Sequence, residues 1–229
     1  MMLLDQAVRF SEIILAFALV QQGLEYCRGM RQEKILGFIC VFLSIPLLFG
    51  YYPVVAEAGL LLTVGVLLYR FQGPYNGGSD CMTALVLLCL FLSHIAPTTF
   101  WQEIALGYLA FQLCFSYFQS GYIKIINLDW RSGQALKDVF FITAYPVSQH
   151  VRKFGQSPKL MLVMSWLVIL FELLFPLSLF NQVTLSAALI VAAFFHLANA
   201  CLFGLNRFFW IWLSAYPILI WFQYRLVLS

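Results

Sequence analysis

Long apolar runs recur along almost the whole chain, and they limit how it can fold more than any other feature. Eight runs of mainly apolar residues are separated by short polar or turn-forming segments, at about 8–27, 34–50, 54–71, 82–97, 100–126, 159–180, 183–203 and 207–227. A helix needs about 20 such residues to cross the hydrocarbon core of a bilayer. The runs are continuous and do not alternate in polarity, so they predict helices and not the strands of a β-barrel.

The composition places these runs in a lipid bilayer. Hydrophobic residues make up 62% of the chain and charged residues 10%, which is far from the balance of a soluble domain. The sequence therefore predicts an all-α protein, a polytopic transmembrane helix bundle of about eight spans that forms one domain over residues 1–229. The last run contains Pro217 and could also form two half-spans.

Basic residues are distributed unevenly between the two sides that eight crossings define. Arg9 and Arg225 fall on the side of both termini, whereas the other side collects Arg28, Arg31, Lys34, Arg70, Arg131, Lys137, Arg152, Lys153, Lys159 and Arg207. Lysine and arginine accumulate in cytoplasmic loops. The sequence thus predicts an integral, multi-pass membrane protein with both termini on the non-cytoplasmic side.

The longest connection, residues 127–158, has a helical pattern of its own. In "DWRSGQALKDVFFI", Leu136, Val139 and Phe140 alternate with polar residues at the spacing of an amphipathic helix. We expect this segment to lie on the membrane surface as an interfacial helix between the fifth and sixth spans.

Ionisable side chains within the apolar runs are the first candidates for a functional site, because they are costly in a membrane. They are Glu12, Glu25, Glu57, Glu103, Lys124, Glu172 and His196. For Glu25, Glu57 and Glu103 we expect positions near span ends, where interfacial water satisfies them.

Lys124 is the strongest candidate, because polar residues precede it on its own helix at spacings of three and four. They are Gln112, Ser116, Gln119 and Ser120, which together form one polar stripe leading to the lysine. Such a stripe can line a binding site or can hold two helices together. A lysine, unlike an arginine, can lose its proton and act as a base.

His196 and Asn199 lie three residues apart on one helix face within a span. The other histidines, His94 and His150, are far away in sequence and form none of the paired motifs of membrane di-iron enzymes. We therefore expect no metal site. The glycine-rich stretch "GPYNGGSDCM" contains Asn76 and Asp80 and can form a turn or a polar edge of the lysine site. No nucleotide-binding or nucleic-acid-binding motif is present.

Three stretches together identify a family resemblance. They are "YNGGSDCMTALVLL", "SGYIKIINLDWRSGQAL" and "HLANACLFGLNRFFW", and in order and spacing they cover about residues 70–210. The chain resembles the HTTM superfamily, the membrane domain shared with vitamin K-dependent gamma-carboxylase. In that enzyme a lysine ahead of an Asp-Trp pair deprotonates reduced vitamin K, which then reacts with oxygen. Here Lys124, ahead of Asp129 and Trp130, resembles that lysine.

The resemblance implies a first hypothesis, a membrane protein that binds a lipidic, vitamin K-like quinol and oxidises it with Lys124 as the catalytic base. It would then be a carboxylase-like or epoxidase-like enzyme. The supporting substrate-binding residues would be Gln119, Ser120, Asp129, Trp130, His196, Asn199, Asn76 and Asp80. Small size and family suggest the bacterial inner membrane. The alternative is a non-catalytic membrane subunit or maturation factor that binds a partner protein or an exported peptide. A transporter comes third, because no inverted repeat is evident.

Overall fold

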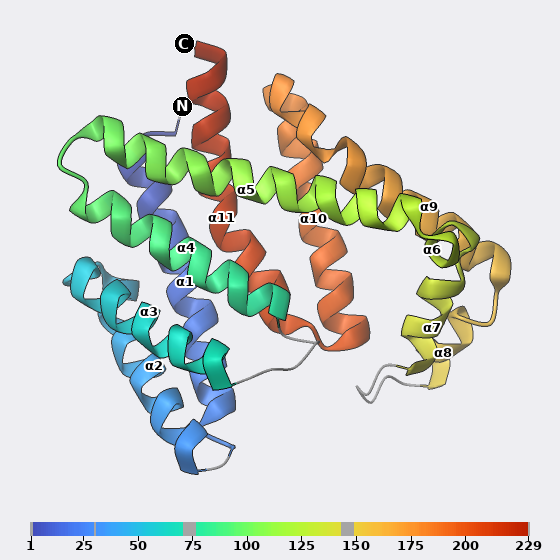
Figure 1. Ribbon diagram of the computed structural model, residues 1–229, viewed down its shortest axis with the longest axis horizontal. Coiled ribbons are helices and arrows are strands. Elements are labelled where there is room, and N and C mark those ends of the chain that lie inside the picture. The colour runs from blue at the N-terminus through green and yellow to red at the C-terminus, as the bar shows by residue number, and fades with distance from the viewer. Residues whose placement is uncertain (1, 30, 71–76, 143–148, 229) are drawn as a thin grey trace. The chain divides into compact units, whose positions relative to one another are not determined.

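The computed structural model describes residues 2–29, 31–70, 77–142 and 149–228, and every regular element within these ranges is a helix (Figure 1). The prediction of an all-helical protein is therefore confirmed. The long helices are α1 (Leu4–Tyr26), α2 (Arg31–Phe49), α3 (Pro53–Arg70), α4 (Gly77–Ile95), α5 (Thr99–Ile126), α9 (Pro158–Leu174), α10 (Gln182–Phe203) and α11 (Asn206–Leu228). The short elements are α6 (Leu128–Ser132), α7 (Gln134–Ile142), α8 (Gln149–Phe154) and the 3-10 helix η1 (Phe175–Phe180).

Each apolar run of the sequence coincides with a long helix, except that the run at 159–180 forms α9 followed by η1, and the helices begin one to five residues earlier than predicted. Capping explains several boundaries. Ser157 and Asn181 accept hydrogen bonds from the first turns of α9 and α10, and Gly204 ends α10 with a φ of 70°. The suggested division at Pro217 is wrong, because α11 continues through this residue.

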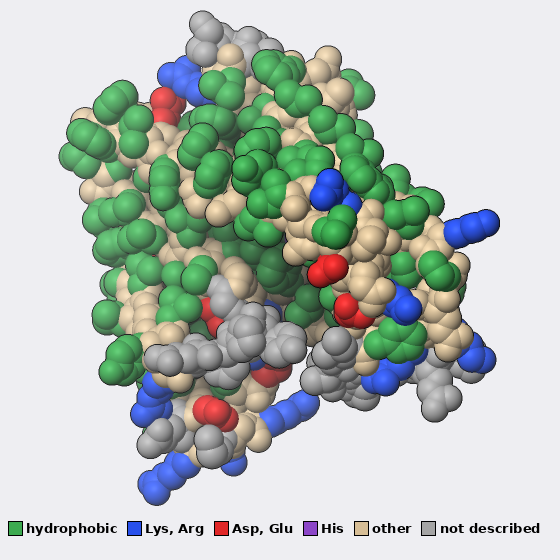
Figure 2. Space-filling view, turned by 45° about the vertical axis from the view of Figure 1, so that its right-hand side comes forward, with side chains coloured by type: hydrophobic (Ala, Val, Ile, Leu, Met, Phe, Trp, Pro, Cys, Tyr) green, Lys and Arg blue, Asp and Glu red, His purple; other side chains and the backbone are tan. Residues whose placement is uncertain are grey.

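Among the described residues, five helices are long and apolar enough to cross a membrane: α1, α3, α4, the α9–η1 segment Pro158–Phe180, and α10. Many large hydrophobic side chains are exposed, among them Phe42 at 74% and Phe194 at 68%. Figure 2 shows hydrophobic side chains over much of the visible surface, with charged groups mostly in the lower part of the view. Exposure of so much apolar surface to water is unfavourable, whereas its contact with lipid chains is favourable. The chain is thus a multi-pass membrane protein, and the full set of eight crossings stays a prediction.

The first compact unit comprises Met1–Phe111 and Arg207–Ser229. Its helices α1 and α2 pack closely at two glycines, because a Cβ atom on Gly37 would lie 2.6 Å from the carbonyl oxygen of Gly23. The beginning of α1 and the end of α11 lie at the same end of this unit (Figure 1). An even number of crossings would produce this arrangement, but the side of the membrane that it faces stays a prediction.

The second unit comprises Gln112–Asn206 and contains the last part of α5, the helices α6 to α10 and η1. The segment expected to be one amphipathic helix forms two, because Gly133 separates α6 from α7 with a φ of 80°. Ser165 and Trp166 of α9 donate hydrogen bonds to the carbonyl oxygens of Trp130 and Arg131. These bonds fix α6 on α9. The interfacial location of α7 stays a prediction.

Candidate functional site

Lys124 near the end of α5 forms an ion pair with Glu172 of α9. Its Nζ atom lies 2.9 Å from Oε1 and 2.6 Å from Oε2 of Glu172. The lysine side chain is 17% exposed and the glutamate side chain 5%. Both charges are therefore largely removed from solvent, where each requires a partner of opposite sign.

A glycine one turn before Lys124 allows the two helices to come this close. Gly121 is buried, and a Cβ atom there would lie 2.7 Å from the backbone nitrogen of Leu173 and 3.0 Å from Cβ of Glu172. A larger residue would push α5 and α9 apart. The small residue in "SGYIK" thus belongs to the geometry of the ion pair.

Trp130 covers the lysine from a third element. Asn127 caps α6 by accepting a hydrogen bond from the backbone nitrogen of Asp129, and the chain turns so that Trp130 faces back toward α5. The Nζ atom of Lys124 lies 5.1 Å from the centroid of the indole ring. A cation at this distance is attracted by the negative face of the ring.

A second buried polar pair lies on the same face of α5, two turns before the lysine. The hydroxyl group of Tyr117 and Nε2 of His196 lie 2.7 Å apart, and the two residues are 3% and 1% exposed. Tyr117 also stacks on Phe175, with ring centroids 4.0 Å apart. Phe175 follows Glu172 by three residues, so Tyr117 and Lys124 of α5 contact the same α9–η1 segment of the chain. We define the lysine site as Lys124, Glu172, Trp130, Tyr117 and His196.

The HTTM domain family matches residues 94–224, which is more than half of the chain and includes the whole lysine site. The chain belongs to the HTTM family. No curated protein and no solved structure matches it. The resemblance inferred from the three sequence stretches is thus confirmed at the level of the family.

Of the predicted site residues of this HTTM protein, Lys124 and Trp130 are in contact, whereas His196 contacts Tyr117, two turns before Lys124 on α5. Gln119 and Asp129 are exposed, whereas Ser120 and Asn199 are half-buried. In the described part of the chain, Lys124 forms no hydrogen bond with the remaining predicted residues of its unit, which are Gln119, Ser120, Asp129 and Asn199. Asp80 is a buried residue of α4 in the first unit, and Asn76 lies outside the described residues.

Sequence reasoning missed the roles of Glu172 and Tyr117. Glu172 was recognisable as an ionisable residue within a span, and its opposite charge was the signal that could have paired it with Lys124. Tyr117 carried no such signal, because a tyrosine among aromatic residues resembles ordinary packing. Its role can be recognised only from the structure, which places His196 of α10 beside it.

The three glutamates expected near span ends have different environments. Glu25 pairs with Arg207, and Glu103 pairs with Arg225, at partly exposed helix ends, which agrees with the expectation. Glu57 also lies near a helix end, in the second turn of α3, so its expected position agrees and only its expected contact with interfacial water does not. This residue of α3 is 0% exposed and lies within the first unit.

Proposed function

We propose that this HTTM protein binds a reduced lipidic quinone at the lysine site and that the Lys124–Glu172 pair removes a proton from its hydroxyl group. The observation that carries the proposal is the buried ion pair covered by an aromatic ring in the part of the chain that matches the family. An ion pair of this kind is expensive to build in a membrane. It therefore favours a role beyond holding two helices together.

The residues around the pair suit an aromatic, apolar ligand. Trp130 offers an indole face beside Lys124, and Phe171 and Phe175 surround Tyr117 with ring centroids 6.0 Å and 4.0 Å away. Aromatic faces bind flat rings, and apolar residues of α9 and α10 suit an isoprenoid tail. The few polar groups would orient the ring by its oxygen atoms.

The chemistry of the ion pair follows from its two components. Lys124 and Glu172 can exchange a proton across their hydrogen bond, which leaves a neutral amine beside a neutral carboxylic acid. The amine can then accept a proton from a hydroxyl group held next to it, so that the pair gains one positive charge in total. Trp130 would stabilise this cation through its ring face.

A reduced quinone supplies two electrons to an oxidant, and the loss of its hydroxyl protons makes this transfer easier. The protein's part is to hold the ring, to exclude water and to take the proton. Tyr117 and His196 could hold a second oxygen atom of the ring, because both are hydrogen-bonding groups surrounded by apolar residues.

The decisive experiment measures oxygen uptake and quinone-epoxide formation by the purified protein with a reduced naphthoquinone. We expect turnover by the wild type, loss of turnover with Lys124→Ala and strong reduction with Glu172→Gln. Lys159→Ala, an exposed lysine at the beginning of α9, is the matched control and should retain activity. Turnover that survives Lys124→Ala at equal folding would refute the proposed base.

A second function, the binding of a membrane or peptide partner protein, is favoured by the outer face of α5. Phe115, Phe118 and Tyr122 follow one another at spacings of three and four and are 42%, 43% and 53% exposed. Phe118 and Tyr122 stack with ring centroids 6.5 Å apart, which gives a firm aromatic surface. The double variant Phe118→Leu/Tyr122→Leu would keep this surface apolar for lipid and remove the rings. Loss of co-purifying partner in that variant, with Lys124→Ala unaffected, would support the second function.

A further inference from the structure

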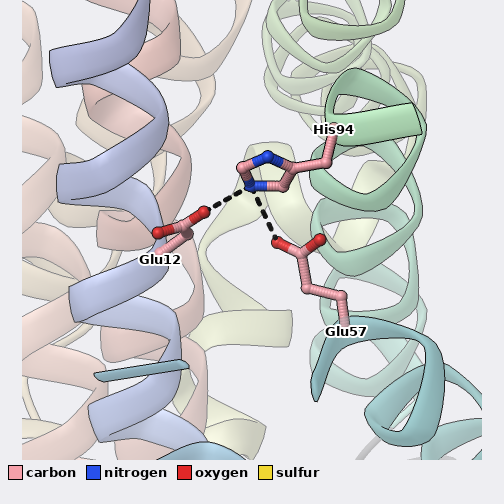
Figure 3. Close-up of side chains that lie close together, drawn as sticks. All are labelled: Glu12, Glu57 and His94. Carbon is pink, nitrogen blue, oxygen red and sulfur yellow. Dashed lines mark hydrogen bonds and ion pairs between the residues drawn. The ribbon is translucent and has the colours of Figure 1, made fainter. Parts of the chain in front are cut away.

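Three ionisable side chains meet in the first unit, apart from the lysine site. They are Glu12 of α1, Glu57 of α3 and His94 of α4, and each comes from a helix that is able to cross a membrane. Figure 3 shows the imidazole ring between the two carboxyl groups, with the same ring nitrogen directed toward both. This atom, Nε2, lies 2.6 Å from Oε1 of Glu12 and 3.8 Å from Oε1 of Glu57.

Glu57 is the member of this cluster whose hydrogen-bonding capacity the protein leaves unused. The residue is 0% exposed, and within the described residues neither of its carboxyl oxygens has a hydrogen-bond partner. A buried polar group without a partner is rare in native proteins and often indicates an ion or a water molecule that completes the site. Its oxygen faces the position between Glu12 and His94 (Figure 3).

Glu12, in contrast, is held in place by a second residue. Arg9 donates a hydrogen bond from Nη1 to Oε2 of Glu12 at 2.7 Å, and it also donates to the carbonyl oxygens of Leu47 and Leu48 near the end of α2. These carbonyl groups are at the negative end of a helix dipole, so they stabilise the positive charge of Arg9. The other carboxyl oxygen of Glu12 is thereby oriented toward His94. In metal sites, hydrogen bonds from neighbouring residues orient the ligand side chains in the same way.

We propose that Glu12, Glu57 and His94 bind one divalent first-row transition-metal ion, with Nε2 of His94 as its nitrogen ligand. The three ligand atoms all lie within 4.8 Å of one another. Zinc binds nitrogen and oxygen ligands at about 2.0–2.2 Å, so the ligand atoms of a tetrahedral ion are roughly 3.4 Å apart. The observed separations of 2.6 Å and 3.8 Å lie on either side of this value.

The ligand types narrow the choice of ion. An imidazole nitrogen with carboxylate oxygens suits zinc, iron, cobalt or manganese, whereas calcium needs six to eight oxygen ligands. Three protein ligands leave a coordination position for water or another molecule. His94 is partly exposed, with 23% of its side chain accessible, and therefore provides a side from which an ion can enter.

The cluster of Glu12, Glu57 and His94 is separate from the lysine site. Two of the three ligands, Glu12 and Glu57, precede residue 94, where the family match begins. The cluster also lies in a different unit from Lys124. Its test therefore needs neither a quinone nor catalytic turnover.

The experiment titrates Zn²⁺ into the full-length protein after a chelator has removed bound metal. We expect one Zn²⁺ per chain, an increase in the melting temperature of the wild type, and binding at least about tenfold weaker in Glu57→Gln and in His94→Gln. Glu103→Gln is the matched control, because it changes a carboxylate of the same unit that pairs with Arg225 outside the cluster. This control should bind Zn²⁺ like the wild type.

A second measurement does not depend on how well a variant folds. Co²⁺ bound to the wild-type protein should give the visible absorption bands of a site with nitrogen and oxygen ligands, and Zn²⁺ should displace it. The proposal is overturned if the wild type retains neither ion, or if well-folded Glu57→Gln and His94→Gln bind Zn²⁺ as tightly as Glu103→Gln does.

Discussion

Lys124 and Glu172, which are 48 residues apart in the sequence, form one buried ion pair with distances of 2.6 Å and 2.9 Å from Nζ to the carboxylate oxygens. This pair joins the end of α5 to α9 within the second unit. The effect of the pair on stability can be measured by thermal unfolding, without any assay of its proposed chemistry.

Lys124→Ala should destabilise the protein strongly, because it leaves the carboxylate of Glu172 buried without a partner. Loss of one member of a buried pair costs about 3–5 kcal/mol. The double variant Lys124→Ala/Glu172→Leu should recover most of this loss, since no charge remains to be buried. Thermal unfolding in detergent measures both, with Lys159→Ala as the exposed-lysine control. A double variant no more stable than the single one would contradict the ion-pair interpretation.

Tyr117→Phe should have a smaller and more local effect. It removes the hydroxyl group that contacts Nε2 of His196 at 2.7 Å but keeps the ring that stacks on Phe175. We expect a loss of about 1 kcal/mol in the free energy of unfolding. Tyr122→Phe, on the exposed face of α5, should change nothing measurable. Equal losses in the two variants would show that the Tyr117–His196 contact does not contribute to stability.

Gly133→Ala should disrupt the turn that places Trp130 over Lys124. The residue has a φ of 80°, and a Cβ atom there would lie 2.7 Å from the backbone nitrogen of Leu162. The conformation alone costs about 1–2 kcal/mol for a residue with a side chain. Thermal unfolding should therefore show a clear decrease in melting temperature.

Gly65→Ala is the matched control for this change. Gly65 lies within α3, and nothing lies within 4 Å of an added Cβ atom. Alanine should stabilise the helix there by about 0.5–1 kcal/mol. The two glycine variants should thus shift the melting temperature in opposite directions, and a shift in the same direction would contradict the role assigned to Gly133.

The sequence predicts the helices well because each long apolar run carries its own signal. The run at about 100–126 becomes α5 at Thr99–Ile126 with almost no change in its bounds. Local chemistry also predicts an end such as Gly204, where a glycine permits the positive φ that terminates α10. Such features depend on residues that are close together in the chain, and so they can be recognised without a structure.

The candidate sites are less predictable because their contacts join distant helices. The ionisable residue Glu172 is visible in the sequence, but its pairing with Lys124 depends on how α5 and α9 cross at Gly121. In the same way, His94 has no histidine partner at a recognisable spacing. Its neighbours are Glu12 and Glu57, which are 82 and 37 positions earlier in the chain. Sequence spacing therefore argued against a metal site that three-dimensional proximity favours.

Glu57→Gln should be more stable than the wild type without metal and less stable than the wild type with metal. In chelator the variant should melt at a higher temperature than the wild type, by the equivalent of about 1–3 kcal/mol, because it replaces a buried carboxyl group without a hydrogen-bond partner by a neutral amide of similar shape. In excess Zn²⁺ the wild type should become the more stable protein, since a ligand stabilises only the chain that binds it. Differential scanning fluorimetry in detergent, with Glu103→Gln beside it, measures both conditions. A variant that is less stable than the wild type in chelator would show that Glu57 has a stabilising partner without metal, and its carboxylate would then not be a vacant ligand.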